Sequence, residues 1–316
     1  MFRSWSLASR ACRAGAGVLA VSAAAAVAEC AGADAKPTGS APAQVSAAKL
    51  ASVFDHTLLK PEASPADVRA LCEEAHRYSF ASVCVNPSFV AEARAYLDAL
   101  AAREGTERVV RVCTVIGFPL GATTSRVKAF EAEEAVNAGA DEIDMVLPVG
   151  RLRGRADVAA VTRDLAAVAE VSQRRGVVLK VILETALLND DERDLAVMLA
   201  AQTGCDFVKT STGFAKGGAT VKDVGAMHEQ AAVVAGTGVG VAGGMRVKAS
   251  GGVRTCEQAM RMLGAGASRL GASASVAIFE ECVALGYVSG ADEHVKAAAP
   301  AAGSASAPAA NSDDAY

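Results

Sequence analysis

Three lysines lie inside apolar segments that have the length and composition of buried β-strands: Lys180, Lys209 and Lys248. A fourth such segment, EIDMVLP, contains Asp144. A charged group in a buried strand is costly to desolvate, so each needs a paired partner or a function. An amine can attack a carbonyl carbon only when it is unprotonated, and desolvation beside a second ammonium favours that state. The pattern therefore indicates carbonyl chemistry, in which one lysine attacks while another keeps it neutral.

The same residues have a structural interpretation, in which Asp144 and the lysines form a buried ion-pair network that holds the strands together. Three lysines with one aspartate favour function over this alternative, because a buried ion network is weak evidence of stabilisation. Residue spacing does not choose between Lys209 and Lys248 as the nucleophile. No metal and no cofactor is expected, because the four histidines are scattered and the cysteines lack the spacing of metal ligands.

Small residues follow the last three strand-like segments and indicate a site for an anion. Gly213 lies after the Lys209 segment, Gly251 and Gly252 follow Lys248, and Ser273 comes shortly after the next strand-like run. Glycines and serines in such loops expose backbone N–H groups, and the loops after the seventh and eighth strands of a barrel are a common phosphate site. Ordinary turn chemistry is the alternative for each loop taken alone.

Positioning these residues requires a repeating strand–helix architecture. Apolar runs of strand length are expected at 53–55, 81–85, 108–116, 142–147, 177–183, 207–210, 245–249 and 269–271. Helical patterns follow them at 65–78, 87–103, 124–138, 157–175, 189–203, 220–235, 255–264 and 273–285. Eight such alternations in about 240 residues predict an α/β fold, a single (β/α)8 TIM barrel. An open doubly wound sheet is the competing architecture, but no GxGxxG turn follows the first strand.

The ends of the chain differ in composition from this core. We expect a low-complexity extension over 1–47, a barrel over 48–290 and a disordered tail over 291–316. The extension has early arginines and no acidic residue before Glu29, so it could be a transit peptide for an organelle matrix, a signal peptide or an extension without an address.

Charge and cysteine content limit the partners and the compartment. The net charge is −4, which does not favour nucleic-acid binding, and no apolar run is long enough to predict a membrane span. Six of the eight cysteines, including Cys256 and Cys282, fall in or beside predicted elements, where reduced thiols are expected. The cytoplasm is therefore the expected compartment. The oligomeric state, with a homodimer or a higher homo-oligomer among the options, stays open.

Seven motifs resemble those of the deoxyribose-phosphate aldolases, in that family's order and spacing across about residues 48–285. They are FDHTLLKP (54–61), VCVNP (83–87), IGFPLG (116–121), DEIDMV (141–146), LKVILET (179–185), FVKTSTGF (207–214) and KASGGVR (248–254). The pair KTSTGF and KASGGVR is not a general barrel pattern, so the resemblance is specific. The glycine-rich stretch GTGVGVAGGMR (236–246) before the Lys248 segment is longer than the corresponding part of the family pattern.

The resemblance implies catalytic roles for three residues. Lys209 would be the lysine that forms the Schiff base, Lys248 the second lysine that keeps it neutral, and Asp144 part of the proton relay. Asp55 and Lys180 would support the hydroxyl-binding and proton network.

The resemblance also implies further contacts. Gly213, Gly251, Gly252 and Ser273 would bind the phosphate of a phosphorylated sugar. Cys84 matches a cysteine that lies near the cavity in the family, where filling space is the expected role. Tyr316, the last residue, matches a terminal tyrosine that reaches the active site in some members, although a tail without a role is the alternative.

The implied reaction is reversible cleavage of 2-deoxy-D-ribose 5-phosphate to D-glyceraldehyde 3-phosphate and acetaldehyde, in deoxyribonucleotide catabolism. No metal is needed, because the iminium takes the place of a Lewis acid. A transaldolase or a ketose-bisphosphate aldolase is the enzymatic alternative. An inactive barrel that serves as a scaffold is the non-enzymatic one.

Overall fold

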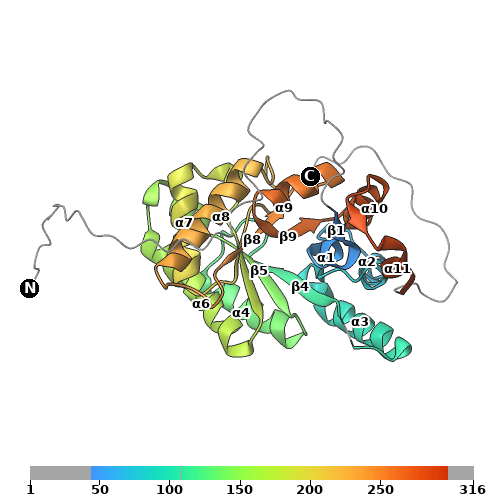
Figure 1. Cartoon of the computed structure of the whole chain (residues 1–316). Helices are drawn as coiled ribbons and strands as arrows, with labels where there is room; N and C mark the ends of the chain where they lie inside the picture. Colours follow the sequence, from blue (N-terminus) through green and yellow to red (C-terminus); the bar gives the residue numbers. More distant parts are fainter. Residues whose placement is uncertain (1–43, 108, 298–316) are drawn as a thin grey trace, which may run out of the picture. The chain divides into compact units, whose positions relative to one another are not determined.

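A closed barrel of eight parallel strands, β2 to β9, forms the centre of the fold (Figure 1). The computed structural model describes residues 44–297 except 108, with no side-chain description for 296 and 297. The barrel strands are β2 (Phe54–Leu58), β3 (Ser82–Val85), β4 (Arg111–Ile116), β5 (Glu142–Val146), β6 (Val178–Ile182), β7 (Phe207–Lys209), β8 (Arg246–Ser250) and β9 (Ala267–Ala272). Each strand pairs in parallel with the next, and β2 closes the ring against β9. The predicted (β/α)8 barrel is confirmed.

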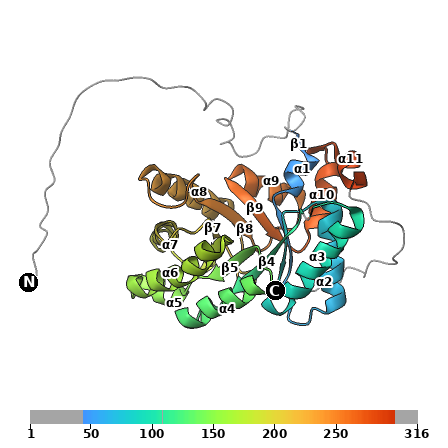
Figure 2. The same ribbon diagram turned by 90° about the horizontal axis from the view of Figure 1, so that it is seen from below.

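Within the described residues, eight longer helices belong to the barrel units. The view from below shows helices outside the strands (Figure 2). The eight helices are α2 (Pro65–Tyr78), α3 (Val90–Glu104), α4 (Ser125–Asn137), α6 (Val158–Arg175), α7 (Asp190–Gln202), α8 (Val221–Gly236), α9 (Cys256–Gly264) and α10 (Ser275–Ala284). Short helices are α1 (Ala47–Ala51), α5 (Val149–Leu152) and the 3-10 turns η1 (Pro87–Phe89), η2 (Arg153–Arg155) and η3 (Thr185–Leu187). The sequence placed α2 at its observed bounds because Ser64 forms a capping box with Asp67 and Pro65 opens the helix.

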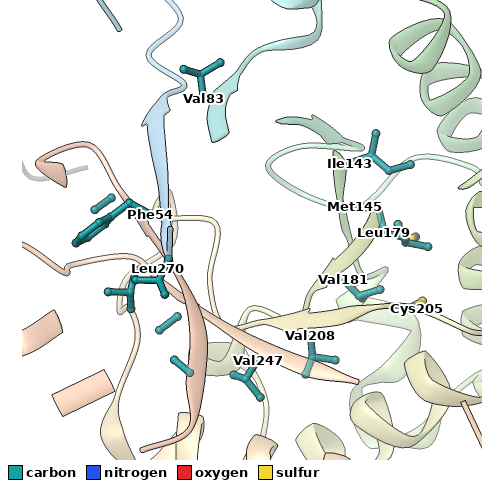
Figure 3. Packing of buried hydrophobic residues seen from close by; sticks show 14 of the residues in the cluster. Phe54, Val83, Ile143, Met145, Leu179, Val181, Cys205, Val208, Val247 and Leu270 are labelled. Atoms are coloured by element: carbon teal, nitrogen blue, oxygen red, sulfur yellow. The ribbon is translucent and has the colours of Figure 1, made fainter. Parts of the chain in front are cut away.

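The strands alternate between two environments with a period of two residues. Ile143, Leu179, Val181 and Val208 point outward and belong to the large cluster between strands and helices (Figure 3). The residues between them point into the barrel, where they form two groups. One is a small apolar cluster containing Cys84 and Cys113, and the other is the charged cluster described below.

The predicted end of the first barrel strand is wrong. β2 begins at Phe54 and runs to Leu58, so Asp55 is its second residue and lies deep in the barrel rather than at the carboxyl end. The sequence pattern failed here because the strand continues through polar residues. The buried His56 continues β2 on the outside, where its Nε2 lies 2.7 Å from Glu74 Oε2. Polar strand residues with such partners carry no apolar signal.

The expected boundary at 48 lies inside α1, and the expected boundary at 290 lies between two ordered elements. β1 (Val45–Ser46) pairs in parallel with β10 (Val288–Ser289), and this two-stranded sheet precedes a last helix, α11 (Ala291–Ala297). His294 on α11 lies with its Nε2 2.8 Å from the backbone oxygen of Tyr78. The expected disorder from 291 is therefore wrong for 291–297, because a composition rule does not detect this docking contact. The expectations for 1–43 and 298–316 lie outside the described residues.

The cysteines do not all match the expectation of reduced thiols. Cys256 at the start of α9 and Cys282 in α10 form a disulfide, whereas Cys72, Cys84, Cys113 and Cys205 are free and buried. The two partners are 26 residues apart, and only the packing of α9 against α10 brings them together. Within the described part of the chain, none of the helices is long and apolar enough to cross a membrane.

Candidate active site

Asp144 on β5 is the centre of a charged cluster inside the barrel. Its Oδ1 accepts from Lys180 Nζ at 2.7 Å, and its Oδ2 accepts from Lys209 Nζ at 3.0 Å and Lys248 Nζ at 2.8 Å. The lysines come from β6, β7 and β8, whose register places Asp144 beside Lys180 and Lys209 beside Lys248. All four side chains are buried, and Lys209 is the one lysine with measurable exposure, at 3%. The structure thus brings together the predicted catalytic residues.

A second tier of charges supports this centre from deeper in the barrel. Lys248 Nζ lies 2.5 Å from Asp55 Oδ2, and Lys180 Nζ lies 2.6 Å from Glu142 Oε2. Arg269 on β9 bridges the two carboxylates, at 2.6 Å from Asp55 Oδ1 and 3.3 Å from Glu142 Oε1. Asp55 therefore pairs with Lys248 and Arg269 within a continuous ion network.

The network sets the charge states of its members. Burial alone would raise the pKa of Asp144, but the three lysines outweigh it and hold that pKa well below its usual range. Burial would lower the pKa of Lys248, yet Asp144 and Asp55 raise it above the ordinary value. The pKa of Lys180 is raised in the same way, chiefly by Asp144. Asp144 is therefore an anion, and Lys180 and Lys248 are ammonium ions.

The predicted cavity cysteine, Cys84, lies beside this centre with a second thiol that the sequence did not single out. Cys113 is its register partner on β4, and the Cys113 Sγ lies 3.3 Å from both Asp144 Oδ1 and Lys180 Nζ. A hydrogen bond from Cys113 lowers the pKa of the Cys84 thiol against the opposing effect of burial. Burial raises the pKa of Cys113.

Two groups in the barrel have the spacing of metal ligands. Cys84, Cys113 and Asp144 offer ligand atoms within 4.8 Å of one another, and Asp55, Cys113 and Glu142 do the same. In both groups the carboxylates are already salt-bridged to lysine or arginine. Those positive charges oppose the binding of a further cation.

Gly271 on β9 makes room for the lysine of the neighbouring strand. A Cβ at this position would lie 2.9 Å from Lys248 Cε and 3.0 Å from Ser250 Cβ, closer than packed carbon atoms approach. A residue larger than glycine would therefore displace the Lys248 side chain. The long glycine-rich stretch at 236–246 does not displace the Lys248 side chain, since Lys248 contacts Asp144 directly.

The loops after β7 and β8 are in contact where a phosphate site was predicted. Gly213, Gly251 and Gly252 have φ angles of 87°, 88° and 77°, a region that favours glycine. A Cβ on Gly251 would lie 3.2 Å from Gly218 Cα and 3.7 Å from Gly213 Cα, whereas Gly252 faces open space. Ser273 is exposed and follows β9 directly, and the pairing of Ser250 with Gly271 puts it beside the β8 loop. Tyr316 lies outside the described residues.

Sequence reasoning assigned no role to three charged residues in or beside the site: Glu142, Glu184 and Arg269. Side chains two residues apart on a strand point to the same face. This spacing could have placed Glu142 beside Asp144 on β5 and Arg269 on the face of Gly271 on β9. Glu184 follows β6, is 4% exposed, and accepts hydrogen bonds from Thr212 after β7. Nothing in its local sequence indicates that partner.

Comparison with known proteins gives a consistent family. Residues 49–294 match the model of the DeoC/LacD family aldolases. The deoxyribose-phosphate aldolase of Clostridium perfringens (strain SM101 / Type A) is 49% identical over 232 residues, covering 73% of this chain and 95% of the relative. That of Streptococcus pneumoniae serotype 19F (strain G54) is 50% identical, with coverages of 73% and 96%.

A solved structure of a relative agrees with this result. The tetrameric deoxyribose phosphate aldolase from Aeropyrum pernix superposes with a TM-score of 0.65 at 35% identity, covering 76% of this chain and 93% of that one. The (β/α)8 barrel, together with the match to the aldolase family model and to these relatives, defines a barrel aldolase. The chain belongs to the DeoC/LacD family of aldolases.

Proposed function

We propose that this chain is a class I aldolase that reversibly cleaves 2-deoxy-D-ribose 5-phosphate to D-glyceraldehyde 3-phosphate and acetaldehyde through a Schiff base on Lys209. The observation that carries the proposal is the contact of three lysine amines with one carboxylate, Asp144, inside the barrel. The names of the relatives support the choice of substrate.

The charge balance supports Lys209 as the nucleophile. The cluster holds four buried cations and three buried carboxylates: Lys180, Lys209, Lys248 and Arg269 face Asp55, Glu142 and Asp144. One surplus positive charge in a buried site favours release of one proton. Lys180 contacts three carboxylates and Lys248 contacts two, whereas Lys209 contacts only Asp144. Lys209 has the fewest carboxylate contacts of the three lysines and is the one with measurable exposure, so we assign the nucleophilic amine to it.

The reaction then proceeds through an iminium. The Lys209 amine adds to the C1 aldehyde and water leaves, which forms a protonated Schiff base. A base removes the C3 hydroxyl proton, the C2–C3 bond breaks, and its electron pair moves to the iminium to give an enamine and D-glyceraldehyde 3-phosphate. Protonation of the enamine at C2 and hydrolysis of the imine release acetaldehyde and restore the amine.

Asp144, Lys248 and a water molecule form the proposed proton relay. Asp144 is an anion and Lys248 is a cation, so a water bound beside both has an acceptor on one side and a donor on the other, and we assign the proton transfers to that water. Asp55 and Lys180 keep the relay in place. No resident cofactor takes part in these steps, because the iminium itself accepts the electron pair.

The loops after β7, β8 and β9 form the proposed phosphate site. The backbones of Gly213, Gly251 and Gly252 have positive φ angles, a region that favours glycine. A Cβ on Gly252 would have no atom within 4 Å, so the space beside its Cα is unfilled. Backbone N–H groups in such loops bind anions well. Ser273 adds a hydroxyl next to them, at the position where barrel enzymes commonly bind phosphate.

The wider setting of the reaction is also a proposal. The substrate belongs to deoxyribonucleotide catabolism, and the cytoplasm is the proposed compartment. A homo-oligomer is supported by the tetramer of the Aeropyrum pernix relative. Cys84 is proposed to fill space beside the relay, and a part for Tyr316 in enamine protonation remains the proposal made from the sequence.

Borohydride trapping tests the assignment. The protein is incubated with 2-deoxy-D-ribose 5-phosphate and sodium borohydride, and peptides are mapped by mass spectrometry. The reduced adduct is expected on the peptide that contains Lys209, and Lys209→Arg is expected to abolish it. An adduct on Lys180 or Lys248, or no adduct, would refute the assignment. Faster cleavage of ketose phosphates than of the deoxyribose ester would instead support a transaldolase or ketose-bisphosphate aldolase.

A further inference from the structure

Glu184 has an unusual backbone for a buried side chain. It follows β6 by two residues and has φ 56° and ψ 63°, the left-handed region that disfavours residues other than glycine, asparagine and aspartate. Among the described residues, Ser79 and Arg155 are the other non-glycines with positive φ, and neither is buried. A strained backbone persists only where the surroundings hold it, and such residues cluster at functional sites.

Backbone contacts to β7 hold Glu184 in this conformation. On one side the Leu183 N–H donates to the Lys209 oxygen at 2.9 Å, and on the other the Thr185 N–H donates to the Thr210 oxygen at 3.0 Å. Glu184 is therefore fixed next to the strand that carries the proposed nucleophile, at its carboxyl end.

The side chain of Glu184 organises the loop after β7. Its Oε2 accepts from the Thr212 N–H at 3.2 Å and from the Thr212 hydroxyl at 2.5 Å. The same hydroxyl oxygen accepts from the Phe214 N–H at 3.1 Å. One buried carboxylate thus fixes Thr212 twice, and through Thr212 it fixes both sides of Gly213.

The loop after β7 is the part of the proposed phosphate site that packs against the loop after β8. A Cβ on Gly251 would lie 3.2 Å from Ser211 Cβ and 3.7 Å from Gly213 Cα, so a shift of the β7 loop would also displace the β8 loop. The Thr212 N–H donates to Glu184 and the Phe214 N–H donates to the Thr212 hydroxyl oxygen, whereas the Gly213 N–H donates to no group among the described residues. This arrangement leaves the Gly213 N–H for a ligand.

We propose that Glu184 is a positioning residue that acts through Thr212 to hold the Gly213 loop in its phosphate-binding conformation, and so sets the preference for phosphorylated over unphosphorylated sugar. This inference rests on the proposed function. A direct contact with the phosphate is unfavourable for Glu184, because two anions would then share a poorly solvated site. Its effect is transmitted by the two hydrogen bonds to Thr212.

The test compares steady-state kinetics on 2-deoxy-D-ribose 5-phosphate and on unphosphorylated 2-deoxy-D-ribose. Glu184→Asn keeps a residue that tolerates the left-handed backbone but is too short to reach Thr212. It is expected to raise KM for the phosphate ester about tenfold or more, with kcat changed less than about threefold and with kcat/KM for the free sugar unchanged. Glu184→Gln keeps a side-chain oxygen at the same distance from Thr212, so its KM for the phosphate ester is expected to stay close to that of the wild type.

Two further variants control the experiment. Thr212→Val removes the hydroxyl partner and should raise the same KM, and combining it with Glu184→Asn should add little, because both act through one contact. Glu192→Gln is the matched control, since Glu192 is a mostly buried glutamate that accepts from the Gly154 and Asn189 N–H groups on the outside of the barrel. It should leave both KM values unchanged.

Equal losses on the two sugars, an unchanged KM in Glu184→Asn, or additive effects with Thr212→Val would overturn the inference. If Glu184→Asn does not fold, Thr212→Val alone decides, by the same comparison of the two sugars. Borohydride trapping in the wild-type protein separates the two proposals. An adduct on Lys209, together with equal losses of activity on the two sugars, would refute only the role of Glu184. The absence of any adduct would refute the proposed function.

Discussion

Three lysines of the same chemistry share one carboxylate, Asp144, but have different surroundings. Each lysine contacts it at 3.0 Å or less, yet the lysines differ in what else they touch. Lys180 and Lys248 reach the deeper carboxylates Glu142 and Asp55, and Lys209 does not. A single amine at the rim of the network is left without a second counterion. The three amines thus differ in the number of carboxylate contacts, and the proposed nucleophile is the amine with the fewest.

The first prediction concerns the surplus charge. Lys248→Met removes one cation and leaves three buried cations facing three carboxylates, so the surplus positive charge beside Lys209 is lost. We expect activity at pH 7 to fall by about 100-fold or more, and the pH of half-maximal activity to rise, because a positive charge near the nucleophile favours its neutral form. Lys248→Arg keeps the charge and is the control, so its profile should stay at the wild-type pH even if its rate is lower. A profile for Lys248→Met at the wild-type pH would contradict the charge argument.

At the scale of elements, the sequence predicted the eight strand–helix units and the residues at the centre, but only Asp55 of the second tier of charges. Strand runs such as VVLKVIL are apolar enough to be found, and α2 is bounded by strong capping residues. Asp55 was placed at a strand end because β2 continues through His56 and Thr57, whose polar groups find local partners. The Cys256–Cys282 disulfide and the pairing of Glu184 with Thr212 depend on which elements are neighbours in space. A single sequence carries no local signal for that.

The second prediction concerns the contact between β8 and β9. In Gly271→Ala the new Cβ would lie 2.9 Å from Lys248 Cε, and the flexible lysine is the group that moves. We expect kcat to fall about tenfold or more, and the pH profile to shift in the same direction as in Lys248→Met, because the displaced ammonium contacts Asp144 less closely. The measurement is the pH dependence of kcat, with thermal unfolding to verify folding.

Gly225→Ala is the matched control for this variant. Gly225 lies within α8, and a Cβ there would have no atom within 4 Å. Alanine should leave the kinetics unchanged and stabilise the fold by up to about 1 kcal/mol through helix propensity. If Gly271→Ala behaves like this control, Gly271 has no part in placing Lys248.

At the scale of the whole molecule, closure of the barrel brings the charged side chains of the site together. It also removes them from water, which is unfavourable in free energy. The charged cluster takes side chains from β2, β5, β6, β7, β8 and β9, and β2 meets β9 only when the ring closes. Removing these groups from water is unfavourable by several kcal/mol per ion, and the pairing returns part of that only in the complete fold. Stability of the barrel is therefore tied to the ionisation of its interior carboxylates.

The last prediction follows from that link. Burial alone would raise the pKa values of Asp55, Glu142 and Asp144, but the facing lysines and Arg269 outweigh it and lower all three. In the unfolded chain these carboxyls titrate near 4, so on acidification the unfolded state binds protons before the native state does. Their contribution to stability is thus complete above about pH 5 and is lost as the pH falls through 4 toward the lower native values. Three such groups give a slope of up to about 4 kcal/mol per pH unit below about pH 3.5.

Urea unfolding from pH 7 to pH 3 should show a steep loss of stability that begins near pH 5, with proton uptake on acid unfolding measured by potentiometry. Glu142→Gln cannot ionise at that position, so it should reduce the slope by about a third. A wild-type stability that stays flat to pH 3, or a variant slope equal to that of the wild type, would show that the interior carboxylates do not control acid unfolding.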